Sequence, residues 1–222
     1  MAAELDGPRL EPREGETRHL VVFLHGYGAD GNDLIDIGRA WQPILPHTAF
    51  VSPHAPERVA GAPSGRQWYA INSSRPEERW QSSNASAAAL AQFLDAELGR
   101  RNLSPSALAL VGFSQGTQMA LRAGLARPVA PAGIVGYSGM LSLPAEPENV
   151  AAAVRSRPPI ILIHGDADQV IPIDALFQTT QILAELEIPA EWHISHGIGH
   201  GIDGEGLRHG GEFLRRRFGL PR

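Results

Sequence analysis

The chain has 222 residues, of which 43% are hydrophobic, a size and composition typical of one α/β domain with a substantial core. Its formal net charge is −5, and no basic run or stripe indicates binding to nucleic acid or to an anionic membrane. Cysteine is absent, and every one of the 19 basic residues is arginine. Thiol catalysis, disulfides, cysteine-based metal sites and lysine Schiff-base or P-loop chemistry are therefore excluded.

The N-terminal region, residues 1–16, is polar and contains Pro8 and Pro12. It lacks the basic segment followed by an apolar segment that a secretory signal requires, and no apolar run approaches the length of a membrane span. We therefore expect a cytoplasmic protein with no stable membrane insertion. Residues 1–18 are expected to be a polar N-terminal segment with room for an extra edge strand, and residues 19–222 a single domain.

Apolar runs typical of buried strands alternate along the chain with helical segments. The expected strands cover residues 19–24, 48–52, 108–113, 132–137, 160–164 and 190–195. The expected helices cover residues 33–44, with Asn32 as N-cap, and then 84–101, 117–126, 150–155, 172–186 and 203–218. Residues 53–83 are expected to be irregular. This alternation predicts a mostly parallel sheet with helices on both faces, whose ligands bind beyond the carboxyl ends of the strands.

The most informative motif is Gly112-Phe113-Ser114-Gln115-Gly116, which follows an expected strand and precedes an expected helix. In this setting a G-x-S-x-G sequence forms a nucleophile elbow, a strained turn that presents the serine hydroxyl beyond the sheet edge. The two glycines let neighbouring backbone pass close by, and the free N–H of Gln115 at the helix N-terminus can face a developing oxyanion. The alternative interpretation is a glycine-rich turn with a solvated serine.

A serine nucleophile needs a histidine base and an acid that orients the base. In hydrolases built around such an elbow, the acid and then the histidine follow the serine in the chain. Asp166 and Asp168 come directly after the expected strand at 160–164, so both lie at the required end of the sheet. Either is a candidate acid, and the alternative is that both are loop or helix-capping residues.

Histidines suitable as the base lie further along the chain. His200, in a glycine-rich loop between the last strand and the last helix, is the preferred base, and His196 is the second choice. His193, inside the strand, is typical of a packing residue, and His209, on the helix, of a surface residue. Zinc ligation by His193, His196 and His200 is a competing interpretation, but the intervening glycines argue against the helix that would align them. No metal site is expected.

The loop after the first strand reads His25-Gly26-Tyr27-Gly28-Ala29-Asp30-Gly31. Its glycines let backbone N–H groups turn inward, and the candidate oxyanion donors are the backbone N–H groups of Tyr27 and Gln115. The same loop matches the G-x-G-x-x-G spacing of nucleotide-binding loops. The imidazole of His25 and the absence of an acidic residue after the second strand argue against a dinucleotide site.

Four stretches carry a joint pattern: residues 23–31, 112–116, 164–168 and the pair Gly199-His200. Together they resemble the carboxylesterase/phospholipase family of α/β-hydrolases, which includes the acyl-protein thioesterases, over residues 19–218. The resemblance implies an α/β-hydrolase fold with no large cap domain. It also implies that Asp168 is the triad acid, with Asp166 structural, that His200 is the base, and that Tyr27 and Gln115 are the oxyanion donors.

The chain departs from the family pattern at two positions near these motifs. Gln169 stands where the family often has proline, and Thr117 stands where it often has glycine. These departures bear on loop geometry and pocket size rather than on the chemistry.

The expected function is that of a serine carboxylesterase that acts on short-to-medium acyl esters, needs no cofactor and takes a small-molecule substrate. A lysophospholipase or acyl-protein thioesterase is the alternative within this class. A hydrolase-fold binding protein without catalysis is the alternative from another class, and a homodimer is one option for assembly.

The candidate substrate-binding residues are apolar side chains within residues 53–83. The alternative is that these side chains pin the segment to the domain. They are Trp68, Tyr69, Ile71 and Trp80.

Overall fold

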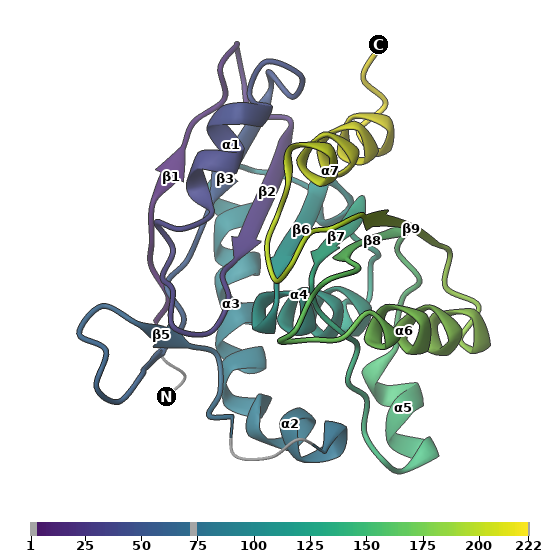
Figure 1. The fold of residues 1–222 in the computed structure, drawn as a ribbon. Coiled ribbons are helices and arrows are strands. Elements are labelled where there is room, and N and C mark those ends of the chain that lie inside the picture. Colours follow the sequence, from purple (N-terminus) through teal and green to yellow (C-terminus); the bar gives the residue numbers. More distant parts are fainter. Residues whose placement is uncertain (1–3, 72–74, 222) are drawn as a thin grey trace.

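The computed structural model describes residues 4–71 and 75–221, which form a central sheet between layers of helices (Figure 1). The sheet has seven strands in the order β1-β3-β2-β6-β7-β8-β9. All neighbouring strands pair in parallel except β1, which is antiparallel to β3. The strands are β1 (Arg9–Leu10), β2 (His19–Leu24), β3 (Thr48–Val51), β6 (Leu108–Phe113), β7 (Gly133–Tyr137), β8 (Ile160–Gly165) and β9 (Ala190–Ser195).

Helices cover both faces of this sheet (Figure 1). They are α1 (Ile35–Trp41), α2 (Pro76–Ser82), α3 (Asn84–Arg100), α4 (Gln115–Ala126), α5 (Pro147–Ala153), α6 (Asp174–Glu185) and α7 (Gly204–Arg217), with a 3₁₀ turn at Pro105–Ala107. Core residues of α1 and α7 pack on one face, and those of α3, α4 and α6 on the other. The predicted mostly parallel sheet with helices on both faces is confirmed.

The strands show why the sequence folds this way. In β2, Val21 and Phe23 belong to the core on the α1 and α7 side, whereas Leu20, Val22 and Leu24 belong to the core on the opposite side. Alternate residues of a strand point to opposite faces, so a continuous apolar run is what a strand covered on both sides needs. Such runs fix the register, because a shift of one residue would exchange the two cores.

Residues 53–83 are less irregular than predicted. They contain a short antiparallel ladder between β4 (Glu57–Arg58) and β5 (Arg66–Gln67), and then α2. A helix start is in fact encoded here, since proline occupies the first helical position and Glu77 and Glu78 follow in the first turn. The many proline, glycine and serine residues around this short helix are typical of a loop, so the sequence pattern predicted an irregular segment instead.

The predicted cap of α1 is also wrong. The helix begins at Ile35 after Leu34, two residues beyond the predicted start. The backbone N–H of Asn32 donates instead to the carboxylate of Asp30 at 2.8 Å. Asp30 thus forms a local Asx-type turn that competes with an earlier helix start.

The N-terminal segment adds β1 to the edge of the sheet and is anchored to α3. Arg9 on β1 forms an ion pair of 2.9 Å with Glu97, whose side chain is buried. Burial alone would raise the pKa of Glu97, but hydrogen bonds from Arg9 and Arg101 outweigh it, so the pKa is lowered and the carboxylate stays ionised. None of the helices in the described part of the chain has the length and apolar character that a bilayer span requires.

His19, at the start of β2, predicts an acid-sensitive contribution to stability. Its ring stacks on Phe218 at 4.1 Å between centroids, and its Nδ1 is buried. Burial, with smaller effects of Arg18 and His47, lowers the pKa of His19 to about 4. Since the unfolded chain takes up this proton near pH 6.5 and the folded chain only near pH 4, the free energy of unfolding falls as the pH drops through this window.

We therefore expect His19→Phe, which keeps the stacked ring and cannot titrate, to lose less stability than the wild type between pH 7 and pH 4. The measurement is the Tm of both proteins across this range. The difference in Tm between variant and wild type should grow in favour of the variant as the pH falls. A difference in Tm that stays constant across this pH range would contradict the conclusion that buried His19 makes the fold sensitive to acid.

Candidate active site

Ser114 lies in a sharp turn between β6 and α4. Its backbone has φ 55° and ψ −117°, a strained conformation for a residue other than glycine. The turn leaves no room for side chains on either side, because a Cβ on Gly112 would lie 2.4 Å from the carbonyl oxygen of Gly116. The predicted strand–turn–helix context of the motif is therefore present in the structure.

Gly116 brings α4 against the end of β2. A Cβ at this position would lie 1.8 Å from the carbonyl oxygen of Leu24 and 2.7 Å from that of His25. The close approach places the N-terminus of α4 beside the loop that follows β2. A Cβ on Gly26 in that loop would lie 3.5 Å from the Cβ of Ser114, so the loop runs past the serine.

Thr117 stands where the resembled family often has glycine, and the surrounding residues accommodate its side chain. Its hydroxyl lies 2.8 Å from the carbonyl oxygens of both Gly112 and Tyr137, and its side chain is buried. Cβ atoms on Gly136 and Gly139 would lie 2.7 and 2.3 Å from Thr117 side-chain atoms. The larger residue on α4 is thus matched by two glycines at the end of β7.

Ser114, His200 and Asp168 form one chain of hydrogen bonds. Nδ1 of His200 donates to Oδ2 of Asp168 at 2.7 Å, because an ionised carboxylate can only accept. Nε2 is then free to accept from the hydroxyl of Ser114 at 2.9 Å. The three side chains come from the ends of β6, β8 and β9, the carboxyl edge where parallel sheets bind ligands.

Asp168 is held as an anion although its side chain is fully buried. Burial would raise its pKa, but hydrogen bonds from His200 and from the backbone N–H groups of Ile171 and Val170 outweigh this effect and lower the pKa. Nε2 of His164 lies 3.4 Å from the same carboxylate and donates to the carbonyl of Ile171 at 2.8 Å. Sequence reasoning missed this supporting histidine, although it opens the His-Gly-Asp stretch.

The alternative acid and base form a separate pair. Nδ1 of His196 contacts Oδ2 of Asp166 at 2.8 Å, and Asp166 also accepts from the backbone N–H of Gly197 at 2.6 Å. The His196 side chain is 85% exposed, and this pair ties the loop after β9 to the loop after β8. Gly165 is required between these loops, since its Cβ would lie 2.1 Å from the carbonyl oxygen of Ile198. In this position Asp166 has a structural role, because it holds the two loops together.

The loop that carries Tyr27 is fixed by His25. Nδ1 of this buried histidine donates to the carbonyl of Gly26 at 2.8 Å, while Nε2 accepts from the backbone N–H of Ala55 at 3.0 Å. Burial lowers the pKa of His25, which keeps the ring neutral and its two nitrogens in these different roles. The loop glycine Gly28 has φ 82° and donates to the carbonyl of Arg66 at 2.8 Å.

The four candidate substrate-binding residues do not share one environment. Trp68 and Tyr69 are buried; the indole N–H of Trp68 donates to the carbonyl of His25 at 2.9 Å, and the Tyr69 hydroxyl donates to Gln118. Burial raises the pKa of Tyr69 to about 12. Trp80 on α2 is half-buried beneath the guanidinium of Arg122, 3.7 Å from the ring centroid.

Trp68 and Tyr69 therefore pin their part of this segment, up to residue 71, to the domain, as the alternative interpretation predicts. Ile71 is 54% exposed and is the member of the set that solvent reaches most freely.

The side chain of Gln115 has a structural role that the sequence did not indicate. Its side-chain oxygen accepts from the backbone N–H of Trp68 at 2.9 Å, and its amide donates to the carbonyl of Tyr69 at 2.8 Å. The residue after Ser114 thus ties the start of α4 to the segment that covers it. The predicted oxyanion donor, its backbone N–H, is at the first helical position, where no intrahelical acceptor exists.

Replacement of this side chain is expected to loosen the covering segment. Gln115→Met keeps the backbone N–H but leaves two buried backbone groups without partners, at about 1–3 kcal/mol each. We expect the Tm to fall by about 5 °C or more, with kcat/KM reduced as well. Gln67→Met, which removes only an exposed hydrogen bond to Glu57, is the matched control. Equal Tm values for the two variants would contradict this role.

The zinc interpretation from the sequence does not hold in its original form. His200 contacts Ser114, and His196 contacts Asp166, so the two lie in different hydrogen-bonded groups. His193 lies on the face of β9 that packs against α7, and its ring is tilted by 31° against that of His209.

The comparisons with known proteins place the chain among esterases and acyl-protein thioesterases. A phospholipase/carboxylesterase family model matches residues 5–217. The chain is 30% identical over 177 residues to acyl-protein thioesterase 1 of Schizosaccharomyces pombe, covering 78% of each chain, and 25% identical to esterase YpfH of Escherichia coli, covering 90% of this chain and 83% of that one. The crystal structure of esterase PE8 superimposes with a TM-score of 0.89 and 39% identity, covering 96% of this chain and 99% of that one.

These similarities confirm the predicted resemblance and the α/β-hydrolase fold. The family model spans nearly the whole chain, and the superposition on esterase PE8 covers 96% of it. The chain belongs to the phospholipase/carboxylesterase family of α/β-hydrolases.

Proposed function

We propose that this protein hydrolyses short-to-medium acyl carboxylic esters through an acyl-enzyme intermediate on Ser114. The observation that carries the proposal is the unbroken series of hydrogen bonds from the Ser114 hydroxyl through His200 to Asp168. An isolated serine is a poor nucleophile, and this arrangement supplies both a base for its proton and an anion that stabilises the resulting imidazolium.

The reaction follows from the positions of these groups. Oγ of Ser114 attacks the ester carbonyl carbon while Nε2 of His200 takes the hydroxyl proton. The tetrahedral oxyanion accepts hydrogen bonds from the backbone N–H groups of Tyr27 and Gln115. His200 then gives the proton to the departing alcohol, which leaves the acyl group on Ser114.

The second half of the reaction uses the same groups with water in place of the alcohol. Water attacks the acyl-enzyme carbonyl as it gives a proton to Nε2 of His200, and collapse of the second tetrahedral intermediate returns that proton to Ser114. The carboxylic acid is released. Asp168 stays ionised throughout, as its lowered pKa requires, and holds His200 in the productive tautomer.

The similarity to proteins named as esterases supports simple carboxylic esters as the substrate class. Esterase PE8 is 39% identical to this chain and covers 96% of it, and esterase YpfH aligns over 90% of this chain. The second candidate is hydrolysis of acyl thioesters or lysophospholipids. Acyl-protein thioesterase 1 of Schizosaccharomyces pombe, at 30% identity, supports the thioesters, and the phospholipase/carboxylesterase description of the family supports the lipids. All of these substrates would use the same nucleophile and differ in the acyl and leaving groups.

A substrate panel tests this choice. p-Nitrophenyl esters of increasing acyl length are assayed beside a lysophospholipid and a palmitoylated peptide, with kcat/KM as the readout. The proposal predicts a maximum at short-to-medium acyl length and lower values for the lipid and the peptide. A larger kcat/KM for the palmitoylated peptide than for every p-nitrophenyl ester would favour the second candidate.

A further inference from the structure

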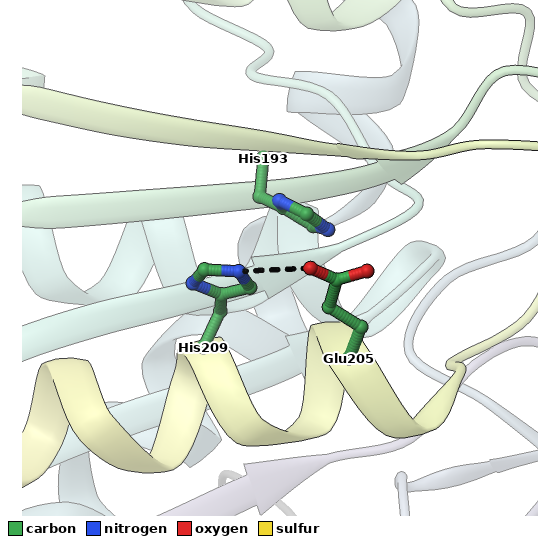
Figure 2. A group of neighbouring side chains, drawn as sticks. All are labelled: His193, Glu205 and His209. Atoms are coloured by element: carbon green, nitrogen blue, oxygen red, sulfur yellow. Dashed lines mark ion pairs between the residues drawn. The ribbon is translucent and has the colours of Figure 1, made fainter.

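A second cluster of polar side chains lies between β9 and α7, outside the candidate active site. Figure 2 shows His193, Glu205 and His209 pointing toward one another, with Glu205 and His209 one turn apart on α7. One potential ligand atom from each residue lies within 4.8 Å of those from the other two. The two imidazole rings are 4.1 Å apart at their centroids, and Nε2 of His209 is 3.7 Å from a carboxylate oxygen of Glu205.

We propose that His193, Glu205 and His209 form a binding site for a divalent transition-metal ion, and that Zn²⁺ is the ion that fits it best. Two imidazole nitrogens and one carboxylate oxygen are a donor set that suits Zn²⁺, with a water molecule as the fourth ligand. Tetrahedral Zn²⁺ with bonds of about 2.0–2.1 Å places its ligands roughly 3.3 Å apart. The ligand atoms, which now lie within 4.8 Å of one another, would have to approach to this spacing when an ion binds.

His193 has an otherwise unexplained buried nitrogen. Its Nε2 is inaccessible to solvent and has no hydrogen-bond partner among the described residues. A buried polar atom without a partner is costly, so such atoms are rare in folded proteins. A bond to a metal ion would give this nitrogen a partner in the direction of Glu205 and His209, toward which the ring points.

Arg208 shows that the cluster attracts positive charge. Its guanidinium lies 3.7 Å from the carboxylate of Glu205 and donates to Nε2 of His209 at 3.1 Å. A guanidinium can only donate, so this nitrogen of His209 carries a lone pair, the form that a metal ion requires. The Arg208 side chain is 59% exposed, so it can move aside when an ion binds.

The position of this site connects it to the loop that carries His200. His193 precedes that loop on β9, and Glu205 and His209 follow it on α7. The hydrogen bond of 2.8 Å from Ser195 to Asp203 already joins the two ends of the loop. A bound ion would add a second, stronger link between them, so we expect a structural site that raises thermal stability and leaves hydrolysis intact.

The test uses the full-length protein after removal of metal with a chelator. Zn²⁺ alone is titrated by calorimetry, and Co²⁺ is used in parallel because its visible absorption reports tetrahedral coordination. We expect one equivalent to bind and the Tm to rise by about 5 °C or more when free Zn²⁺ is a hundredfold above its Kd. Ester hydrolysis should persist at one equivalent of Zn²⁺.

Variants separate this site from the other histidines. Glu205→Gln and His209→Asn should each weaken binding by about tenfold or more, whereas His196→Asn, outside the cluster, should not change it. Arg208→Ala should strengthen binding, because it removes the competing cation. Binding that survives both Glu205→Gln and His209→Asn, or loss of hydrolysis at one equivalent of Zn²⁺, would overturn the proposal and indicate binding elsewhere, for example at His200.

Discussion

Ser114→Ala is expected to lower kcat for ester hydrolysis by about 10⁴-fold or more. The variant keeps the backbone N–H groups of Tyr27 and Gln115 but has no atom to attack the carbonyl or to hold the acyl group. The fold should be unaffected, because among the described residues the hydroxyl of Ser114 forms a side-chain hydrogen bond with His200 alone. The measurements are kcat on a p-nitrophenyl ester and the Tm of the same preparation.

The Tm is the control for this variant. A Tm within a few degrees of the wild-type value shows that lost activity reflects lost chemistry rather than lost structure. Ser138→Ala, which changes a buried serine at the end of β7 whose hydroxyl has only a long 3.4 Å contact with Gly201, is a matched substitution with no part in the proposed chemistry. If Ser114→Ala retained near-native kcat, another residue would have to be the nucleophile.

Gly116→Ala is expected to have the second-largest effect, on both stability and rate. The added methyl group would lie 1.8 Å from the carbonyl oxygen of Leu24, and a backbone atom cannot move aside as a flexible side chain can. Relief of this clash requires α4 to move away from β2. Overpacking of this kind costs about 1–3 kcal/mol or more, and a displacement of about 1 Å at the site costs about 100-fold in rate.

We therefore expect a fall in Tm of several degrees and a fall in kcat of about 100-fold for Gly116→Ala. Gly99→Ala provides the control, because Gly99 lies in α3 with open space where its Cβ would be placed. That substitution should be neutral or stabilising by up to about 1 kcal/mol, since alanine favours the helix. Similar losses of Tm in both variants would show that the close approach of α4 to β2 is not the reason that residue 116 must be glycine.

Much of the fold was predictable because the strands are buried on both faces. Their apolar runs are continuous and distinct from the helical segments, so the parallel sheet follows from the pattern. The elbow was predictable for a different reason: its glycines are imposed by backbone contacts, as the clash at Gly116 shows. The helix within residues 53–83 could not be predicted, because α2 has only seven residues and its proline is typical of both a loop and a helix start.

Within the site, the residues that carry charge or a nucleophile could be found from the sequence, whereas those that hold them in place could not. Chain order and loop position narrowed the acid to Asp166 or Asp168 and favoured His200 over His196 as the base, and the family resemblance then selected Asp168. The part of Gln115 in fixing Trp68 and Tyr69 depends on contacts between residues 46–47 positions apart, which no local pattern encodes. The same is true of the cluster on β9 and α7, where His209 looked like a surface residue because its partner His193 is on another element.

The central claim is that Ser114 is an activated nucleophile, and covalent labelling tests it most directly. The folded protein is treated with a fluorophosphonate probe, which reacts with activated serines, and the modified peptide is mapped by mass spectrometry. We predict stoichiometric labelling at Ser114 and loss of hydrolysis in proportion to labelling, with no labelling of Ser114→Ala. A folded protein that is not labelled, or that is labelled at another serine, would contradict the account.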